Sequence, residues 1–222
     1  MLLLSVDSSA VTASAALTDG EAVIKSELIN KGLTHSETLL PLIEGVMQGY
    51  EYSSLGAIAV SAGPGSFTGI RIGIATVKGI AFPFDIPCIP VSTLEAIAYN
   101  FVDENAIVCA VMDARRMQFY NSLFKIENSS VVRITEDKAR PLEEIEAIVK
   151  RYPKVIVAGD GAELFCKSSS LDNIIIADEE KRFQCGIGVS KCAQNKEKIN
   201  PSSLMPVYLR QSQAERELKL KK

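Results

Sequence analysis

The stretch LLLSVDSSAVTASAALTDGEAVIKSELI, residues 2–29, predicts three consecutive β-strands and decides the fold class of the chain. Residues 2–6 form an apolar run typical of a buried strand, and residues 11–17 form a second strand of small residues. Asp19-Gly20 is a hairpin signal, after which residues 22–29 return as a third strand. This order is a typical opening for an α/β unit, in which helices follow the strands.

A helix, a strand and a glycine-containing turn complete this first unit. Thr34 and Glu37 have the spacing of a capping box, and apolar residues then recur at helical spacing as far as Tyr50. Pro41 lies inside this pattern and is expected to bend the helix or to delay its regular part. Further along the chain we expect a strand at 55–61, a tight loop at 63–69, a helix at 68–82, a strand at 86–90 and a helix from 92 or 93 to 101.

The second half of the chain repeats this order. It contains predicted strands at 106–112, 117–125 and 131–135, a helix at 141–152, a strand at 154–158 and a turn at Gly159-Asp160-Gly161. In each half an aspartate follows the first strand, Asp7 in one and Asp113 in the other. We therefore predict a duplicated α/β fold with two domains, residues 1–104 and residues 105–222, the second ending in a charged tail.

Charge and cysteine content exclude several classes of protein. The 222 residues carry a net charge of −3, which argues against a protein that binds nucleic acid without the help of a partner protein. Five cysteines without a CxxC motif indicate neither a disulfide framework nor a zinc ribbon. No Lys or Arg precedes the first apolar run, and Asp7 interrupts it, so a signal peptide is not expected. These features predict a cytoplasmic protein without a membrane span.

The loop Gly63-Pro64-Gly65-Ser66-Phe67-Thr68-Gly69 is the sharpest local motif. A glycine-rich turn between a strand and a helix can bind phosphate through backbone N–H groups. A P-loop would require Lys where Ile70 stands, and the dinucleotide fingerprint requires Gly or Ala where Thr68 stands. The pattern therefore favours a structural interpretation, in which the glycines permit a cramped turn and close helix packing.

Two aspartates could contribute to a nucleotide cleft. An aspartate at a strand end can bind a metal–nucleotide or act as a base, and it is equally often a turn former. The sequence leaves both interpretations open. If a vestigial nucleotide cleft exists, the residues expected to form it are Asp7, Ser8, Gly63, Gly65 and Asp113. His35, the only histidine, is interpreted as a capping residue at a helix start, without partners for metal or triad chemistry.

The helix expected at 68–82 is apolar on two opposite faces, which is typical of a helix buried on both sides. An internal core helix and an interface helix explain this pattern equally well. We expect a partner interface in which this helix and the one at 35–50 form a four-helix contact with a second subunit. The residues assigned to this interface are Leu39, Leu42, Ile43, Val46, Ile70, Ile74 and Val77.

The stretch from Gly63 to Gly73, followed by Lys78-Gly79, closely resembles the signature of the TsaB family. Four further segments are similar to that family and extend the resemblance over nearly the whole chain. They are Val6-Asp7-Ser8-Ser9, Thr34-His35-Ser36-Glu37, Met112-Asp113-Ala114-Arg115-Arg116 and Pro206-Val207-Tyr208-Leu209-Arg210.

The resemblance implies two RNase-H-like domains of the actin, Hsp70 and sugar-kinase superfamily. It also implies a role in forming N6-threonylcarbamoyladenosine in tRNA. In that system TsaB is the paralogous partner of the catalytic subunit TsaD, and the P-loop ATPase TsaE is the third member. The expected partners are thus TsaD and TsaE, with a homodimer when the chain is alone and tRNA contacted only through the complex.

One departure from the catalytic pattern concerns metal binding. TsaD-like subunits carry two metal-binding histidines in a segment similar to His-Leu-Glu-Ala-His. The matching segment here places Thr93 and Ile97 at the two ligand positions. We therefore expect no metal, no cofactor and no enzymatic activity, and favour a non-catalytic scaffold. The alternative is a small-molecule phosphotransferase of the same superfamily that uses Asp7 and the 63–69 loop around ATP.

Overall fold

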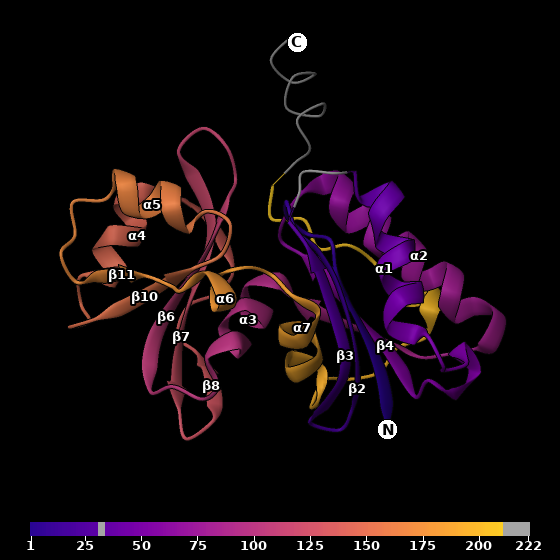
Figure 1. The fold of residues 1–222 in the computed structure, drawn as a ribbon. Helices are drawn as coiled ribbons and strands as arrows, with labels where there is room; N and C mark the ends of the chain where they lie inside the picture. The colour runs from indigo at the N-terminus through magenta and orange to yellow at the C-terminus, as the bar shows by residue number, and fades with distance from the viewer. Residues whose placement is uncertain (31–33, 211–222) are drawn as a thin grey trace, which may run out of the picture.

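Two β-sheets organise the computed structural model, which describes residues 1–30 and 34–210 (Figure 1). The first sheet has the strand order β3-β2-β1-β4-β5, and the second has the order β11-β10-β6-β7-β8, with β9 paired to β7. The strands of the first sheet are β1 (Leu2–Asp7), β2 (Ala13–Asp19), β3 (Ala22–Ile29), β4 (Ala57–Gly63) and β5 (Cys88–Ser92). Those of the second are β6 (Ala106–Asp113), β7 (Gln118–Glu127), β8 (Ser130–Arg133), β9 (Lys138–Pro141), β10 (Val155–Ala158) and β11 (Ile174–Ile176).

The two sheets repeat the same pairing. Strand β1 is antiparallel to β2 and parallel to β4, and β6 is likewise antiparallel to β7 and parallel to β10. This mixed α/β architecture with two related sheets confirms the predicted fold class. The short strand β9, Lys138–Pro141, was not predicted, and Pro141 ends it instead of opening the following helix.

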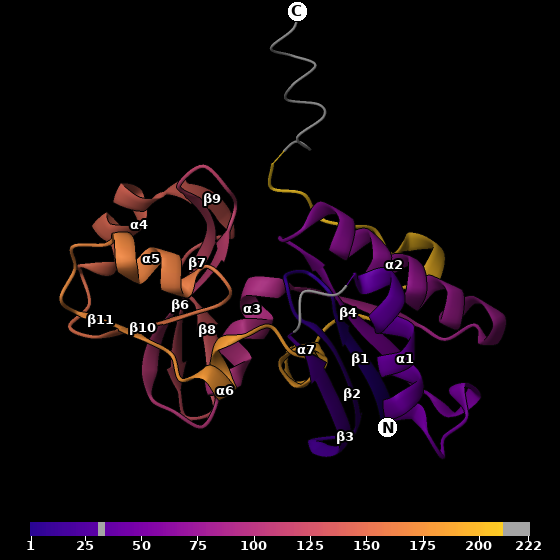
Figure 2. The ribbon, with the colours of Figure 1, turned by 45° about the horizontal axis from the view of Figure 1, so that its top comes forward.

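Helices form three further layers around and between the sheets (Figures 1 and 2). α1 and α2 lie on the outer face of the first sheet, α4 and α5 flank the second, and α3 and α7 lie between the sheets. The helices are α1 (His35–Met47), α2 (Phe67–Ala81), α3 (Thr93–Ala98), α4 (Leu142–Val149), α5 (Ala162–Ser168), α6 (Glu179–Arg182) and α7 (Gly186–Ala193). Single 3₁₀ turns are Tyr52–Ser54, Phe82–Phe84, Tyr99–Phe101 and Pro201–Ser203.

The two central helices are exchanged between the halves of the chain. α3 precedes the second sheet in sequence but packs on it, with Leu94 and Ile97 in one core with Phe124. α7 follows the second sheet in sequence but packs on the first, where Val189 lies in one cluster with Leu3. We call the first sheet with α1, α2 and α7 the first lobe, and the second sheet with α3, α4 and α5 the second lobe.

The end of the described chain also lies on the first lobe. Ile199 forms a β-bridge with Cys88, and the backbone N–H of Val207 donates to the carbonyl of Ala62 at 2.7 Å. The division into residues 1–104 and 105–222 stays a prediction, and it differs from this packing at both α3 and α7. The helices are exchanged because the inner face of each sheet is apolar and needs a covering helix, which the other half of the chain supplies. The predicted tail, residues 215–222, lies outside the described residues.

Several local predictions require correction. The capping box does not form: the carbonyl of Thr34, not its side chain, accepts the N–H of Glu37 at 3.0 Å. α1 includes Pro41, which lies on its exposed side. α5, which extends from Ala162 to Ser168, was not predicted. α7 was not predicted, because its sequence GIGVSKCA has few large apolar residues.

The seven residues assigned to the partner interface lie in the core. All are at most 6% exposed and belong to one hydrophobic cluster between α1, α2 and the first sheet: Leu39, Leu42, Ile43, Val46, Ile70, Ile74 and Val77. The assignment of these side chains to an intermolecular contact is therefore wrong, because the sheet itself covers the wide apolar stripe.

Within the described chain, Phe67–Phe84 has the length and composition of a membrane span, a property that core helices share.

Glycines bring α2 into contact with the turn between β1 and β2. A Cβ atom added at Gly69 would lie 2.1 Å from the carbonyl oxygen of Ser8, and one added at Gly73 would lie 2.4 Å from Ser8 Oγ. Contacts this short cannot exist, so a side chain at Gly69 must displace the helix or the turn, and one at Gly73 must displace the Ser8 hydroxyl that bonds to Gly69. The close approach confirms that these glycines serve packing.

We predict that Gly69→Ala lowers the free energy of unfolding by about 1–3 kcal/mol, because overpacking against backbone cannot relax cheaply. The matched control is Gly79→Ala in the same helix, where no atom lies within 4 Å of the added Cβ. That control should gain up to about 1 kcal/mol from helix propensity. Urea denaturation measures both, and equal stabilities of the two variants would contradict the packing role.

Candidate functional site

A cleft of about 500 Å³ lies at the carboxyl ends of parallel strands from both sheets. This is the place where open α/β sheets bind ligands. Its walls come from the β1–β2 turn, the start of α2, the β6–β7 hairpin, the end of β10 and the C-terminal residues 207–210. The polar and aromatic lining residues include Ser66, Phe67, Asp113, Arg115, Tyr120, Asp160, Tyr208 and Arg210.

Asp7 lies beneath this cleft and does not line it. The carboxylate is fully buried and accepts hydrogen bonds from the backbone N–H and hydroxyl of Ser9, at 2.9 and 2.8 Å, and from the hydroxyl of Ser61. Burial raises the pKa of Asp7, although these hydrogen bonds act in the opposite direction. Its contacts make Asp7 the anchor of the β1–β2 turn.

Two more residues of the expected nucleotide cleft are also covered. Ser8 is buried, and its hydroxyl donates to the carbonyl of Gly69 at 2.9 Å. A Cβ at Gly63 would lie 2.3 Å from the carbonyl oxygen of Val207, so the C-terminal segment covers this glycine. Of the five residues expected to form the cleft, only Gly65 and Asp113 line it, because the loop and the turn pack on each other.

The glycine loop is held against the β1–β2 turn by its own backbone. Ser66 donates its backbone N–H to the carbonyl of Ser9 at 2.7 Å. A Cβ at Gly65 would lie 2.3 Å from the same carbonyl oxygen. One amide that could face a phosphate in a binding loop is thus used internally, as the structural interpretation of the motif requires.

Two carboxylates mark the floor of the cleft. Asp113 accepts the backbone N–H of Arg115 at 2.7 Å and pairs with its guanidinium at 3.3 Å. Asp160 accepts from Nε2 of Gln184 at 2.8 Å. Burial, with added repulsion from Asp113 and Asp7, raises the pKa of Asp160 to about 6. Within the described ranges no three His, Cys, Asp or Glu side chains are arranged to hold a metal ion.

An aromatic stack attaches the C-terminal segment to the mouth of the cleft. The rings of Tyr208 and Phe67 stack with centroids 4.7 Å apart, and the Arg71 guanidinium lies 4.0 Å from the Phe67 centroid. Nε of Arg71 also donates to the Tyr208 hydroxyl at 2.8 Å. Arg210 donates to the carbonyl of Ala114 in the second lobe. Sequence reasoning missed this bridge, although the Pro206–Arg210 motif of the resemblance pointed to these residues.

Both positions that match metal ligands in catalytic subunits are buried in α3. Thr93 and Ile97 have no exposed surface, and Ile97 lies in the second lobe's core with Phe124. The Thr93 hydroxyl has no hydrogen-bond partner among the described residues. Ile97 offers no lone pair, and neither residue lines the cleft. These residues do not fit a metal site.

His35 holds the β1–β2 turn instead of capping α1. It is the first residue of the helix, and Nε2 lies 2.6 Å from the carbonyl oxygen of Ala10, to which it donates. The predicted capping role is therefore wrong. The side chain is directed toward the turn because α1 starts beside it, next to the close contact with Gly69.

Comparison with known proteins places the chain in a class. A family model described as TsaD, tRNA N6-adenosine threonylcarbamoyltransferase, matches residues 31–168, more than half of the chain. Enzymes of this name share short stretches with it, for example 43% identity over 68 residues in Erythrobacter litoralis, covering 30% of this chain and 20% of that enzyme. The chain thus belongs to the family of threonylcarbamoyltransferase-like proteins.

Within this class the full-length similarities are to TsaB. The tRNA threonylcarbamoyladenosine biosynthesis protein TsaB of Bacillus subtilis is 26% identical, covering 97% of this chain and 96% of that protein. TsaB of Escherichia coli is 27% identical, covering 98% of both. The structure of YeaZ from Pseudomonas aeruginosa superposes with a TM-score of 0.81 at 24% identity, covering 94% of this chain and 99% of that one. The chain belongs to the TsaB family.

We predict that Asp160→Asn stabilises the protein near pH 7. A carboxyl with a raised pKa binds its proton more tightly when folded, so wild-type stability should rise as the pH falls from 7 to 5. The amide removes the buried charge and should add about 1–2 kcal/mol at pH 7. Urea denaturation at pH 5, 6 and 7 measures this.

The matched control is Asp172→Asn, which neutralises an exposed carboxylate of the same lobe. In this control the free energy of unfolding should depend on pH between 5 and 7 as it does in the wild type. If the stability of Asp160→Asn depended on pH as that of the wild type does, the raised pKa of the Asp160 carboxyl would be contradicted.

Proposed function

We propose that this chain is a non-catalytic scaffold subunit of the complex that forms N6-threonylcarbamoyladenosine in tRNA, supporting a catalytic TsaD-like subunit. The observation that carries the proposal is that Thr93 and Ile97 are both fully buried, with Ile97 in the core of the second lobe. A catalytic metal needs several ligands and an open position for substrate, and two buried positions without a ligand pair do not supply them. The names of the full-length relatives support the tRNA modification pathway.

The alternative, a phosphotransferase that uses ATP, has less support. It would need Asp7 and the 63–69 loop to face a nucleotide. Asp7 is fully buried beneath serine hydroxyls, and Ser66 in the loop donates its amide to Ser9. The Asp7 carboxylate and the Ser66 amide, which would bind metal and phosphate, are therefore both bonded to Ser9 instead.

The outer face of α2 supplies the partner surface in this proposal. With the inner stripe covered by the sheet, α2 exposes Thr68, Arg71, Ala75 and Gly79 and leaves Ile72 half-buried at the edge of the core. Among the residues not fully buried, one line is spaced alternately four and three apart, as in a coiled-coil seam: Thr68, Ile72, Ala75, Gly79 and, just past the helix, Phe82. The methyl group of Ala75 and the lack of a side chain at Gly79 permit close approach of another helix. On α1, the neighbouring exposed apolar residue is Leu40.

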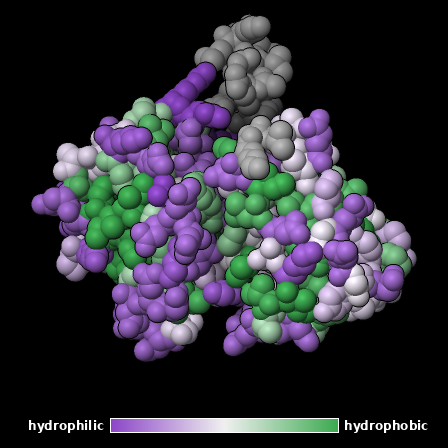
Figure 3. All heavy atoms as spheres, viewed as in Figure 1, coloured by the Kyte–Doolittle hydropathy of each residue, from purple (hydrophilic) through white to green (hydrophobic). Residues whose placement is uncertain are grey.

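Exposure of apolar side chains alone would not identify this face. Hydrophobic surface also appears over the edge strand β3 in Figure 3, where Val23, Ile24 and Leu28 are exposed. Such scattered residues are common on protein surfaces. The α2 seam differs because its regular spacing fits a second helix, and a paralogue with the same fold presents equivalent helices.

The partner that fits this seam is the catalytic TsaD paralogue, in a four-helix contact of α1 and α2 with their counterparts. A second copy of this chain can use the same surface in a twofold homodimer, which competes with the heterodimer. The P-loop ATPase TsaE is the proposed third member. Because the net charge is −3, tRNA is contacted only through the complex, in a cytoplasmic setting.

We predict that Ala75→Glu abolishes both associations and leaves the fold intact, because an exposed position accepts a charge in the monomer but not in a packed helix contact. The matched control is Leu164→Glu on α5, where 38% of the residue is exposed in the other lobe. Circular dichroism and sedimentation, alone and with the catalytic paralogue, measure the outcome. A folded Ala75→Glu variant that still forms both dimers would show that α2 is not the interface.

We also predict that the purified chain carries no stoichiometric zinc or iron and binds ATP weakly with or without magnesium. The reason is that Thr93 and Ile97 offer no ligand pair and the glycine loop is packed internally. Metal analysis of a chelator-free preparation and calorimetric titration with ATP measure these properties. One metal ion per chain, or tight magnesium-dependent ATP binding, would favour the phosphotransferase instead.

A further inference from the structure

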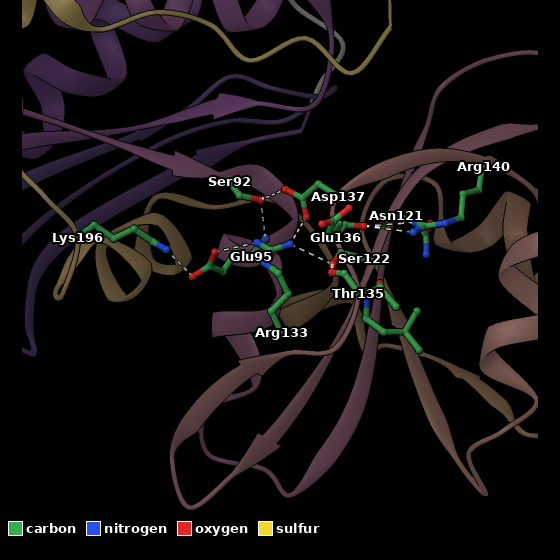
Figure 4. Close-up of polar contacts among 11 residues, drawn as sticks. Ser92, Glu95, Asn121, Ser122, Arg133, Thr135, Glu136, Asp137, Arg140 and Lys196 are labelled. Carbon is green, nitrogen blue, oxygen red and sulfur yellow. Dashed lines mark hydrogen bonds and ion pairs between the residues drawn. The ribbon is translucent and has the colours of Figure 1, made fainter.

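Five polar side chains join three segments that are distant in sequence (Figure 4). The Glu95 carboxylate on α3 accepts from the Arg133 guanidinium on β8 at 2.8 Å and from the Lys196 ammonium, beyond α7, at 2.6 Å. Arg133 also pairs with Asp137, which accepts the hydroxyl hydrogen bond of Ser92 at 2.5 Å. We call these five residues the clasp.

Two bonds of the clasp run between the lobes. Glu95 belongs to α3 in the second lobe, whereas Lys196 follows α7 and lies three residues before Ile199, which pairs with the first sheet. Ser92 ends β5 of the first sheet, and its partner Asp137 precedes β9 of the second. The Arg133 side chain connects both carboxylates, so the two interlobe bonds form one network.

The charged groups of the clasp are largely withdrawn from water. Side-chain exposure is 17% for Glu95, 18% for Asp137, 31% for Arg133 and 33% for Lys196. Burial acts to raise the pKa of Glu95, but hydrogen bonds from Lys196 and Arg133 outweigh it and lower that pKa overall. The carboxylate is therefore charged throughout the neutral range. A partly buried charge without its partners is costly, so separation of the lobes at this point is disfavoured.

The chain returns from the second lobe to the first between α6 and α7, and the start of this crossing is bonded to the segment that joins α3 to β6. Nδ2 of Asn100 donates to the carbonyls of Lys181 and Phe183, both at 3.0 Å. The Lys181 ammonium in turn pairs with Asp103 at 2.9 Å and with Glu104 at 2.7 Å. Hinge motion requires a few residues that absorb changes in backbone angles, and these contacts restrict the return crossing, whereas the Ser92–Asp137 bond lies at the first crossing, from β5 to α3.

We propose that the clasp locks the two lobes in one relative orientation, so that the cleft does not open and close by hinge motion. The chain then acts as a single rigid body, which presents the first lobe at a fixed angle to the second. The fixed orientation is a mechanical property of the chain and does not depend on the identity of its partner.

A native thiol reports whether the lobes separate. Cys192 on α7 is 2% exposed and packs in one cluster with Ala96 of α3, at the junction of the lobes. Cys109 is fully buried in the outer core of the second lobe, away from that junction, and reports global unfolding. Both cysteines are free thiols. Their alkylation rates, measured peptide by peptide with mass spectrometry, therefore distinguish the two kinds of opening.

The test compares Glu95→Gln and Lys196→Met with the wild type, using iodoacetamide on the full-length protein under native conditions. Glu95 acts to raise the pKa of Cys192 and Lys196 acts to lower it, so the two substitutions change thiol acidity in opposite directions. Acceleration in both variants can therefore come only from opening. We expect Cys192 to react at least roughly tenfold faster in both, with Cys109 unchanged.

The matched control is Glu127→Gln, which breaks the exposed Lys125–Glu127 pair of the second sheet and should change neither rate. Unchanged reactivity of Cys192 in Glu95→Gln and Lys196→Met would overturn the proposal. A parallel rise of Cys192 and Cys109 in both variants would also overturn it, because the network would then support global stability only. If Glu95→Gln does not fold, the Cys192 alkylation rate in Lys196→Met alone tests the proposal, because this variant keeps the Glu95–Arg133 pair.

Discussion

The structure depends on the exchange of two helices between the halves of the chain. α3 and α7 lie between the sheets, and each covers the inner face of the sheet formed by the other half. Because each sheet needs this cover, neither half can complete its core alone. The same constraint buries positions 93 and 97 and places Glu95 where both lobes meet. The two positions that match ligands in the catalytic pattern and the carboxylate that joins the lobes thus lie in one short helix.

A second constraint acts at the cleft. The glycine loop and the β1–β2 turn approach so closely that Ser8 and Ser9 occupy the space of three missing side chains, at Gly65, Gly69 and Gly73. Asp7 holds this turn from below through its hydrogen bonds. A loop that resembles a phosphate cradle is thereby used for packing, and the remaining cleft is lined by carboxylates, arginines and aromatic rings.

Much of the fold could be predicted from residues 2–29 and their counterpart after Ala106, because strand runs, turn signals and strand-end aspartates recur in one order. Periodicity also predicted α2, but it could not determine which apolar face meets the sheet. Ile74 and Ala75 are adjacent in sequence, and only tertiary packing shows that the first is core and the second surface. α7 escaped prediction because small residues at a tight contact carry little helical signal. The clasp could not be foreseen, since its members are up to 104 residues apart in sequence, from Ser92 to Lys196.

In the proposed function, this chain supports the modification of tRNA without contributing chemistry from its own cleft. We would measure the rate of N6-threonylcarbamoyladenosine formation by the reconstituted complex, with Asp113→Asn and Asp160→Asn combined in this chain. The account predicts wild-type assembly and a rate within about threefold of the wild type, because positioned acid–base groups contribute roughly 10²–10⁴-fold when they take part in catalysis. A loss of about 100-fold or more with assembly intact would contradict the account, since such a loss is typical of a removed catalytic group.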